Sequence, residues 1–537
     1  MTEFSYNLSQ CHKMTHNDTK AILQILYKNF ANSKKLTKIP KNIQNNIQKP
    51  CFLNAKFYTI ISIYSKEEIK MKFLKISLAA SLALGALSTA SFAQPLEEAI
   101  KGVDVSGYLR YRYTDDRYDN GNGDVSSSSA KHQWRAEADF KTPTINNVSL
   151  NLGILYRNDN QNVNHGNVGG LGSGLGAGQD SDFGVSQFYM TIAPDSTATT
   201  VMLGKQKLGT PVTNPGDGDR GTGILALNSD IPGLTLAAGA FDSWAIDDLN
   251  VSGVYSNASE NSVDKPLYTL AAIYGVDTSI GNIGAQVWFF NVTDMVDAMI
   301  YSELSWKHSV FNASLQYGYA SLKDGNDAFL TNAFASDNDL LNLRIGANFK
   351  EYNVPLGIQL GYLTNFQDGT TVSVDDEGAW TPSIGGKLWW QNNATGVTFG
   401  LAQNINANND ALDNPNYNYR FTTNDEETDL SVFHGVIDYT FLDGRFKIGL
   451  EGAFGENETK ATRAFSIATT PATTFAAGQT TYKTKFTEIT PTVAWKHSKN
   501  LTISGFYAML STEDDRPNST APDEDRNRAR VEVKYTF

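Results

Sequence analysis

Apolar and polar residues alternate along several stretches of the chain after residue 102. This period-two pattern is typical of β-strands, whose successive side chains point to opposite faces. One face of each stretch is apolar and rich in aromatic residues, and the other face carries charged side chains. The pattern runs through residues 103–113, 133–140, 148–157, 446–451 and 528–537. The chain is therefore predicted to be all-β, with strands of about the length that crosses a membrane in a barrel.

The connections between the strands favour one of two architectures. A soluble sandwich would bury the apolar faces between two sheets, whereas a membrane barrel turns them to lipid and encloses the charged faces around a lumen. Outer-membrane barrels have short turns at one edge and long loops at the other. Here short connections (231–233, 307–309, 442–444, 498–500) mostly alternate with long polar ones (114–130, 158–182, 206–222, 243–266, 322–337, 457–481, 513–526). The sequence therefore predicts a transmembrane antiparallel β-barrel.

The strand count depends on the long stretch 367–427. Without it the alternating segments parse into 18 strands. Residues 383–393 and 396–406 could form one extra hairpin, which would give 20 strands. We therefore expect about 18 strands, within a range of 16 to 20.

Two aromatic features support a membrane location. Trp306 and Trp495 each open a Trp-Lys-His-Ser tetrapeptide at a short connection, where the aromatic girdle of a barrel would lie, although chance recurrence of a tetrapeptide is the alternative. The last stretch alternates up to Tyr535 and ends on Phe537. A terminal apolar-out strand that ends in Phe is the assembly signal of bacterial outer-membrane barrels, and an exposed soluble edge this apolar would aggregate. Tyr535 and Phe537 are predicted to form that signal.

Residues 71–93 read as a secretory signal peptide. Lys72 and Lys75 give a positive start, an apolar run of Leu and Ala follows, and Ser91-Phe92-Ala93 offers a small-x-small cleavage site. The run is too short to cross a bilayer as a helix. A signal peptide acts at the start of a chain, so residues 1–70 are predicted to be an upstream extension from a mis-assigned start, and residues 94–537 the mature barrel.

Charge and cysteine content narrow the function. Residues 1–93 hold 13 Lys, no Arg, four acids and both cysteines, so a chain cut after Ala93 keeps 31 basic and 53 acidic residues and a net charge of −22. Such a chain repels nucleic acid and attracts cations. No serine lies in a Gly-x-Ser-x-Gly elbow, and the few mature histidines fall in turns and loops. We expect neither a nucleic-acid partner nor an enzyme.

Residues 94–113, QPLEEAIKGVDVSGYLRYRY, resemble the start of the mature major outer membrane porins of Campylobacter and its relatives. Further matches are GKQKLGT at 204–210, GTG at 221–223, GLTLAA at 233–238 and DS at 242–243. The resemblance implies a homotrimeric barrel of 18 strands in the outer membrane, reached through the periplasm and surrounded by lipid. It also implies a water-filled channel that prefers cations and passes ions and small hydrophilic solutes, with a calcium ion bound in the pore.

A loop after an early strand folds into the barrel of porins and narrows it. The candidate here is 204–223, with Asp217, Asp219 and Arg220 at its tip. The lumen-side residues Arg110, Arg112 and Arg135 are expected to face this tip. Acids and bases opposed across a narrow gap would set a transverse field and select ions by sign. A solvated surface loop is the alternative, because clusters of Gly, Asp and Pro ordinarily mark exposed turns.

The resemblance also suggests where calcium would bind. In the family one acid comes from the inward loop, one from the next long loop and one from a more distant loop. Asp217 matches the first, Asp248 matches the second with Asp247 as a rival, and Glu377 is favoured for the third. Ordinary acidic loop residues are the alternative, because only convergence of several oxygens makes a calcium site.

Two other functions remain open. A substrate-specific channel would show aromatic residues along the lumen, and Trp389-Trp390 is the one candidate. A surface adhesin role could coexist with the pore.

Overall fold

The computed structural model describes residues 102–119, 125–158, 182–216, 218–246, 263, 265–323, 335–375, 377–392, 395–401, 426–461, 465–467, 473–475, 481–515 and 523–537. The chain divides into two units, 1–88 and 89–537, and all described residues belong to the second. The predicted segments 1–70 and 71–93 lie outside the described residues. None of the helices among the described residues has the length and hydropathy to cross a membrane.

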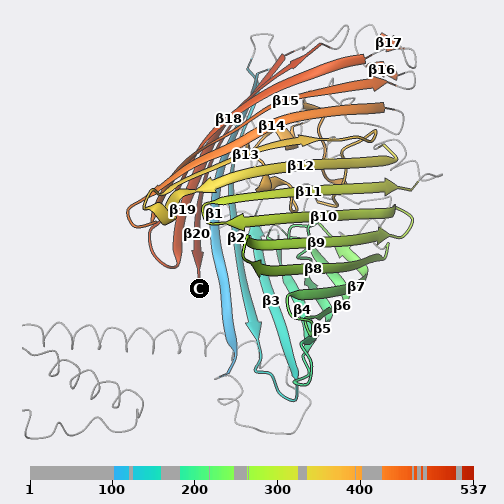
Figure 1. Ribbon diagram of the computed structural model, residues 1–537, viewed down its shortest axis with the longest axis vertical. Coiled ribbons are helices and arrows are strands. Elements are labelled where there is room, and N and C mark those ends of the chain that lie inside the picture. The colour runs from blue at the N-terminus through green and yellow to red at the C-terminus, as the bar shows by residue number, and fades with distance from the viewer. Residues whose placement is uncertain are drawn as a thin grey trace, which may run out of the picture. The chain divides into compact units, whose positions relative to one another are not determined.

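Eighteen strands form one antiparallel sheet in which each strand pairs with its neighbours in the chain (Figure 1). They are β1 (Asp104–Asp119), β2 (Val125–Lys141), β3 (Val148–Asn158), β4 (Asp182–Ile192), β5 (Thr199–Lys207), β6 (Arg220–Asn228), β7 (Leu234–Ala245), β8 (Leu267–Thr278), β9 (Gly281–Val292), β10 (Val296–His308), β11 (Phe311–Leu322), β12 (Asp337–Asn348), β13 (Leu356–Thr364), β14 (Glu426–Phe441), β15 (Phe446–Ala461), β18 (Thr481–Lys496), β19 (Leu501–Asp514) and β20 (Asp523–Thr536).

The remaining described elements are small. Two three-residue strands, β16 (Phe465–Ile467) and β17 (Thr473–Phe475), pair only with each other. Three 3₁₀ turns complete the set: η2 (Phe349–Tyr352), η3 (Thr381–Ser383) and η4 (Trp389–Gln391).

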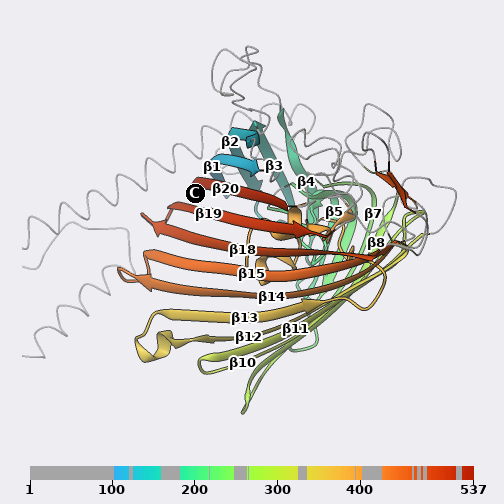
Figure 2. The ribbon, with the colours of Figure 1, turned by 90° about the horizontal axis from the view of Figure 1, so that it is seen from above.

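The sheet closes into a barrel because β20 pairs with β1. Their register sets Tyr108 opposite Thr536 and Tyr111 opposite Val533. Beyond the last strand residue, the backbones of Gly107 and Phe537 exchange two hydrogen bonds, of 3.1 and 3.0 Å. Figure 2 shows the strands curving around an interior that holds non-sheet segments. The expectation of an 18-stranded transmembrane barrel is confirmed.

Alternation decides which side chains face the lumen. On β12, Leu343 and Ile345 are about half exposed on the outer surface, whereas Asn342, which precedes Leu343, is fully buried inside the barrel. Apolar side chains thus face outward, toward lipid, and polar ones face inward, as in outer-membrane barrels.

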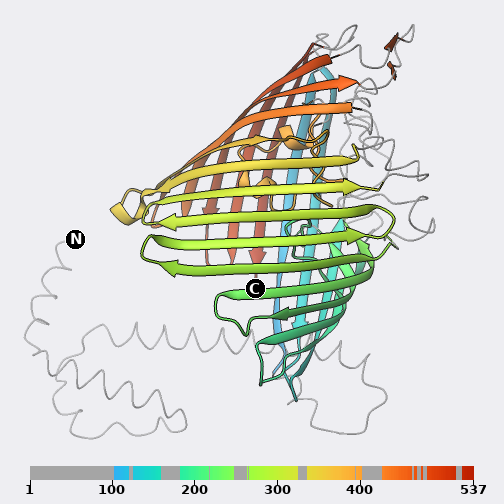
Figure 3. The ribbon, with the colours of Figure 1, turned by 45° about the vertical axis from the view of Figure 1, so that its right-hand side comes forward.

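The short connection between β9 and β10 lies at one edge of the barrel, whereas the connections β8–β9, β10–β11 and β12–β13 lie at the other edge (Figure 3). Leu442, Asp443 and Gly444 all have positive φ in the β14–β15 turn, and Ser309 does so between β10 and β11. Trp306 ends its strand near this edge and donates from Nε1 to the Ile280 carbonyl at 2.8 Å. Trp495 lies near the same edge on β18.

The alternative of 20 strands is wrong. Residues 383–393 and 396–406, taken as a possible extra hairpin, add no strand to the barrel among their described residues. Residues 381–391 instead hold η3 and η4, and the segment around them is buried. This stretch is buried on all sides, since nearly every residue from 383 to 392 is buried, whereas a wall strand buries only every second side chain.

Candidate functional site: the narrowed lumen

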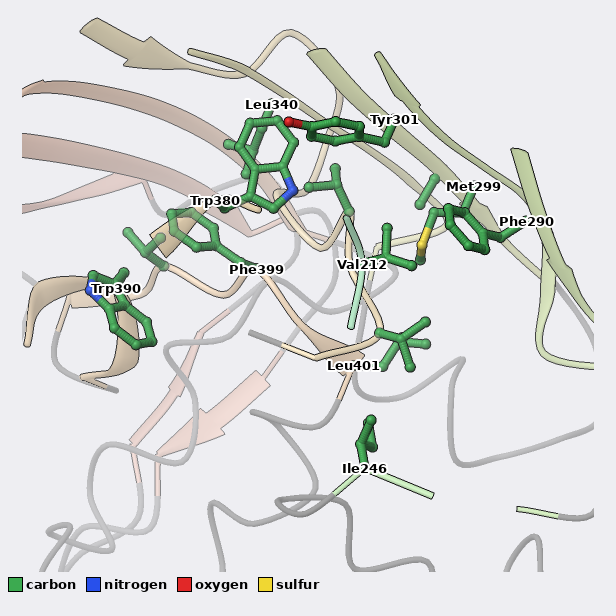
Figure 4. Packing of buried hydrophobic residues seen from close by; sticks show 14 of the residues in the cluster. Val212, Ile246, Phe290, Met299, Tyr301, Leu340, Trp380, Trp390, Phe399 and Leu401 are labelled. Atoms are coloured by element: carbon green, nitrogen blue, oxygen red, sulfur yellow. The ribbon is translucent and has the colours of Figure 1, made fainter. Parts of the chain in front are cut away.

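Two segments fold into the barrel. The first inward segment, residues 208–219, connects β5 to β6, and the second inward segment, residues 365–401, follows β13. Leu208, Val212 and Asp219 of the first are buried, as are Trp380 and Trp389 of the second. Figure 4 shows several of these apolar side chains meeting inside the barrel. The predicted inward loop is present, and a second one joins it.

The first inward segment is shorter than the predicted 204–223, because β5 runs to Lys207 and β6 begins at Arg220. Its base closes where the Leu208 amide donates to the Asp219 carbonyl at 3.1 Å. The Asn214 amide donates to Asp219 Oδ2 at 2.6 Å, and Thr213 Oγ1 donates to the Leu208 carbonyl at 2.6 Å. The structure thus places Asp219 and Arg220 at the base of the segment, not at its tip. Asp217 lies outside the described residues.

The two inward segments bind each other through the backbone. Val374 and Asp375 donate to the Val212 carbonyl at 3.1 and 3.0 Å, and Ala379 donates to the Pro211 carbonyl at 2.7 Å. Asn214 Nδ2 also donates to Glu377 Oε2 at 2.6 Å. The structure therefore brings Glu377 next to the first inward segment.

The second inward segment is held against one side of the barrel. Gln359 donates from Nε2 to the Ser383 carbonyl at 3.0 Å, and Asn342 donates from Nδ2 to Ser383 Oγ at 3.1 Å. The Gly385 amide donates to His434 Nδ1 at 3.2 Å. We call six of the lumen-facing side chains that bond this segment the occupied wall: Gln316, Asn342, Gln359, His434, Glu451 and Glu488, from β11 to β18.

Aromatic packing adds to these hydrogen bonds. Trp380 meets Tyr301 of β10 edge-on, with ring centroids 5.6 Å apart, as Figure 4 shows. Trp389 stacks on Phe486 at 5.5 Å and meets Phe399 edge-on at 5.7 Å. Such pairs contribute beyond the area that they bury. Both Trp389 and Trp390 are almost wholly buried, so the pair offers no aromatic surface to a solute in the lumen.

The part of the barrel wall beyond β19 carries ionised side chains. We call them the charged wall, and they lie on β20, β1 and β2: Arg110, Arg112, Asp116, Arg135, Glu137, Arg526, Arg528, Arg530, Glu532 and Lys534. Pairing sets the predicted Arg110 opposite both Arg135 and Lys534, so all three side chains share the lumen face. Basic groups outnumber carboxylates on this wall.

The charges of this wall are arranged in ion pairs. Arg112 Nη2 lies 3.0 Å from Glu532 Oε2, and Arg110 Nε lies 4.0 Å from the same oxygen. Asp116 accepts from Arg526 at 3.1 Å and from Arg528 Nε at 2.7 Å. The side chains of Arg110, Arg112 and Glu532 remain 11 to 21% exposed, so water reaches this wall.

Arg220 belongs to a second ion cluster. Its Nη2 lies 3.2 Å from Glu137 Oε1, which also lies 3.0 Å from Lys207 Nζ. Its Nε donates to the Ser186 carbonyl at 2.9 Å. Lys207 pairs further with Asp139 at 3.0 Å. Arg220 is therefore fixed to the wall beneath the first inward segment.

The expected calcium ligands are only partly described. Glu377 is placed, whereas Asp217, Asp248 and its rival Asp247 lie outside the described residues. Within the described part of the chain, no group of three or more acidic, His or Cys side chains could hold a metal ion. The calcium site remains a prediction.

Sequence reasoning missed the residues that anchor the second inward segment, Glu451 and Glu488 on the occupied wall and Gln391 at the segment's far end. A signal was available in Gly385-Gly386, a pair that suits a tight backbone turn inside a stretch otherwise taken for strand. For Glu451 on β15 and Glu488 on β18, nothing in the sequence indicates which groups they bind.

Comparison with known proteins gives one family and one fold. The sequence model of the family described as Campylobacter major outer membrane protein matches residues 71–535. No curated protein matches the chain. Among solved structures, OccK3 (OpdO) of Pseudomonas aeruginosa is similar with 13% identity and a TM-score of 0.52, over 83% of this chain and 100% of that one. The outer membrane protein OpdK of the same organism has 16% identity and a TM-score of 0.50, over 81% and 98%.

Proposed function

The chain belongs to the Campylobacter major outer membrane protein family and is an outer-membrane β-barrel porin, and on that premise we propose that it is a passive, cation-preferring channel for ions and small hydrophilic solutes. The observation that most directly supports a water-filled path is the charged wall. Its Arg110, Arg112 and Glu532 side chains stay 11 to 21% exposed beside the two inward segments that reduce the bore. Family and fold favour a channel over an enzyme.

The preference for cations rests on a balance of charges. The acidic background of the mature chain attracts cations, but charges farther than about 8 Å from the path are screened at physiological salt. Close to the path, the basic excess of the charged wall opposes cations. Asp217 of the first inward segment and Asp248 would act against it. We therefore propose a modest preference that weakens as salt rises.

We also propose that the channel is a homotrimer and that it binds one calcium ion in the pore, as the family resemblance implies. Asp217, Asp248 and Glu377 would supply carboxylate oxygens to one calcium ion, and Glu377 already contacts the first inward segment through Asn214. Calcium bound only by the folded protein stabilises it by RT ln(1 + [L]/Kd).

The experiment is the reversal potential of single channels in a KCl gradient, for the wild type and for Asp217→Asn with Asp248→Asn. We expect the wild type to favour K⁺ and the double variant to favour it less. An unchanged reversal potential would remove both aspartates from the selective section. Melting with and without chelator tests calcium in the same two proteins. A chelator effect as large in the double variant as in the wild type would place any calcium elsewhere.

A further inference from the structure

Glu488 of β18 is fully buried and is surrounded by donors from the second inward segment. Its Oε2 accepts from the amides of Leu388 and Trp389, both at 2.9 Å, and its Oε1 accepts from the Lys387 amide at 2.5 Å. Thr490 Oγ1 supplies a fourth hydrogen bond, at 2.6 Å. Three consecutive backbone amides directed at one carboxylate form an anion-binding concavity. Such charge-assisted bonds are among the stronger ones in proteins.

A second glutamate and a glycine complete this arrangement. Glu451 Oε2 accepts from the Gly386 amide at 3.3 Å and lies 2.9 Å from Lys387 Nζ. Gly386 has a φ of +100°, and a Cβ there would lie 2.6 Å from the Trp389 ring and 3.1 Å from Glu488 Oε2. Only glycine fits this turn without strain.

The turn at residues 386–389 also connects to the charged wall, which is separated from β18 only by β19. Gln391 donates from Nε2 to the Lys387 carbonyl at 2.5 Å, so its side chain is fixed by the same turn. Its Oε1 accepts from Arg528 Nη1 at 3.0 Å. Arg528 is itself held by Asp116. A continuous set of bonds therefore runs from Glu488 on β18 to Arg528 on β20 through residues 387–391.

Open space borders the turn at residues 386–389. A cavity of about 300 Å³ is lined by Pro382, Ile384 and Lys387 of the second inward segment and by Gln359 and Glu451 of the wall. The segment is thus packed on one side and bordered by space on another, so its position depends on specific bonds as well as on close packing.

We propose that Glu488, supported by Glu451, is the positioning residue that holds residues 387–391 inside the barrel along β18 to β20 and so sets the open cross-section of the channel. This inference rests on the proposed channel function, but its hydrogen-bond part is independent of it. A glutamine at 488 keeps the shape but offers one acceptor oxygen and one NH₂ donor to amides that are all donors.

The test uses Glu488→Gln and Gly386→Ala, with Glu513→Gln as the matched control. Glu513 is an exposed β19 residue whose neutralisation removes the same charge outside the lumen. Gly386→Ala strains the turn without changing any charge. Folded, heat-modifiable protein in membranes is measured first, and then amide hydrogen exchange at 387–389 and single-channel conductance.

For both lumen variants we expect wild-type yields of folded barrel. Exchange protection at 387–389 should fall at least about tenfold, because a hydrogen bond to a charged group is lost or strained. Conductance should become noisier, with additional levels, while Glu513→Gln behaves as wild type.

Unchanged protection and unchanged conductance in a folded Glu488→Gln barrel would overturn the proposal. Loss of the folded barrel in both lumen variants would also overturn it, because Glu488 would then be needed for barrel formation and not for the segment's position. If the wild type did not conduct, the proposed channel function would be wrong. Amide exchange at 387–389 would still report on the hydrogen bonds to Glu488.

Discussion

The two sides of the lumen are built from different side chains. The occupied wall presents amides, one imidazole and two glutamates, and these groups bond the second inward segment. The charged wall presents arginines and carboxylates that bond one another, and Arg528 also bonds Gln391 of that segment. Buried neutral groups can be satisfied by backbone at little cost, whereas fully desolvating a charge is expensive unless it is paired. The second inward segment is therefore bonded by amides, an imidazole and paired glutamates, whereas Arg110, Arg112 and Glu532 of the charged wall remain partly exposed to water.

The largest effect is expected where the barrel closes, since both walls depend on that seam. Deleting Phe537 removes the two backbone hydrogen bonds with Gly107 and the aromatic end of the terminal strand. We expect most folded, heat-modifiable protein to be lost from membranes. Phe311→Ser is the matched control, because Phe311 is an exposed aromatic residue near the same edge but within the chain. Normal yield after the deletion would contradict a terminal assembly signal.

The next prediction concerns the packing of the second inward segment on the occupied wall. Trp389→Ala removes a fully buried ring that stacks on Phe486 and should cost about 3–5 kcal/mol in the stability of the second inward segment. The segment should become accessible to protease while the barrel keeps its heat-modifiable mobility on gels. Trp495→Ala, on the outer surface, should leave protease resistance unchanged. Equal protease resistance in both variants would mean that the position of the second inward segment does not depend on the Trp389 packing.

The smallest effect on stability, and a clear effect on conduction, is expected on the charged wall. Glu532→Gln leaves Arg112 and Arg110 without their shared carboxylate and raises the positive charge along the path. Stability should change by less than about 1 kcal/mol, as for other hydrated ion pairs. The reversal potential in a KCl gradient should move toward anions. Asp525→Asn, on the outer face of the same strand, should not move it, and an equal shift in both would show that position on the wall is irrelevant.

The sequence by itself determined the wall of the barrel. Alternation reports which side of a strand meets lipid, so residues 103–113 and 528–537 could be assigned and the lumen-facing Arg110, Arg112 and Arg135 named before any coordinates. Short turns such as 442–444 were also predictable, because Asp-Gly pairs favour positive φ. The first inward segment was recognised from its Gly, Pro and Asp content together with the family resemblance.

Only the tertiary structure decided what fills the barrel. Residues 383–393 were a candidate strand of an extra hairpin, yet they turn at Gly385-Gly386 and pack inside, because Glu451 and Glu488, 65 and 101 residues away in sequence, supply acceptors for their amides. Asp219 and Arg220 likewise could be named but not placed, since closure of 208–219 by its own hydrogen bonds sets them at the base. Partners so distant in the chain leave no local periodicity, and only their convergence in space shows which segment the wall will hold.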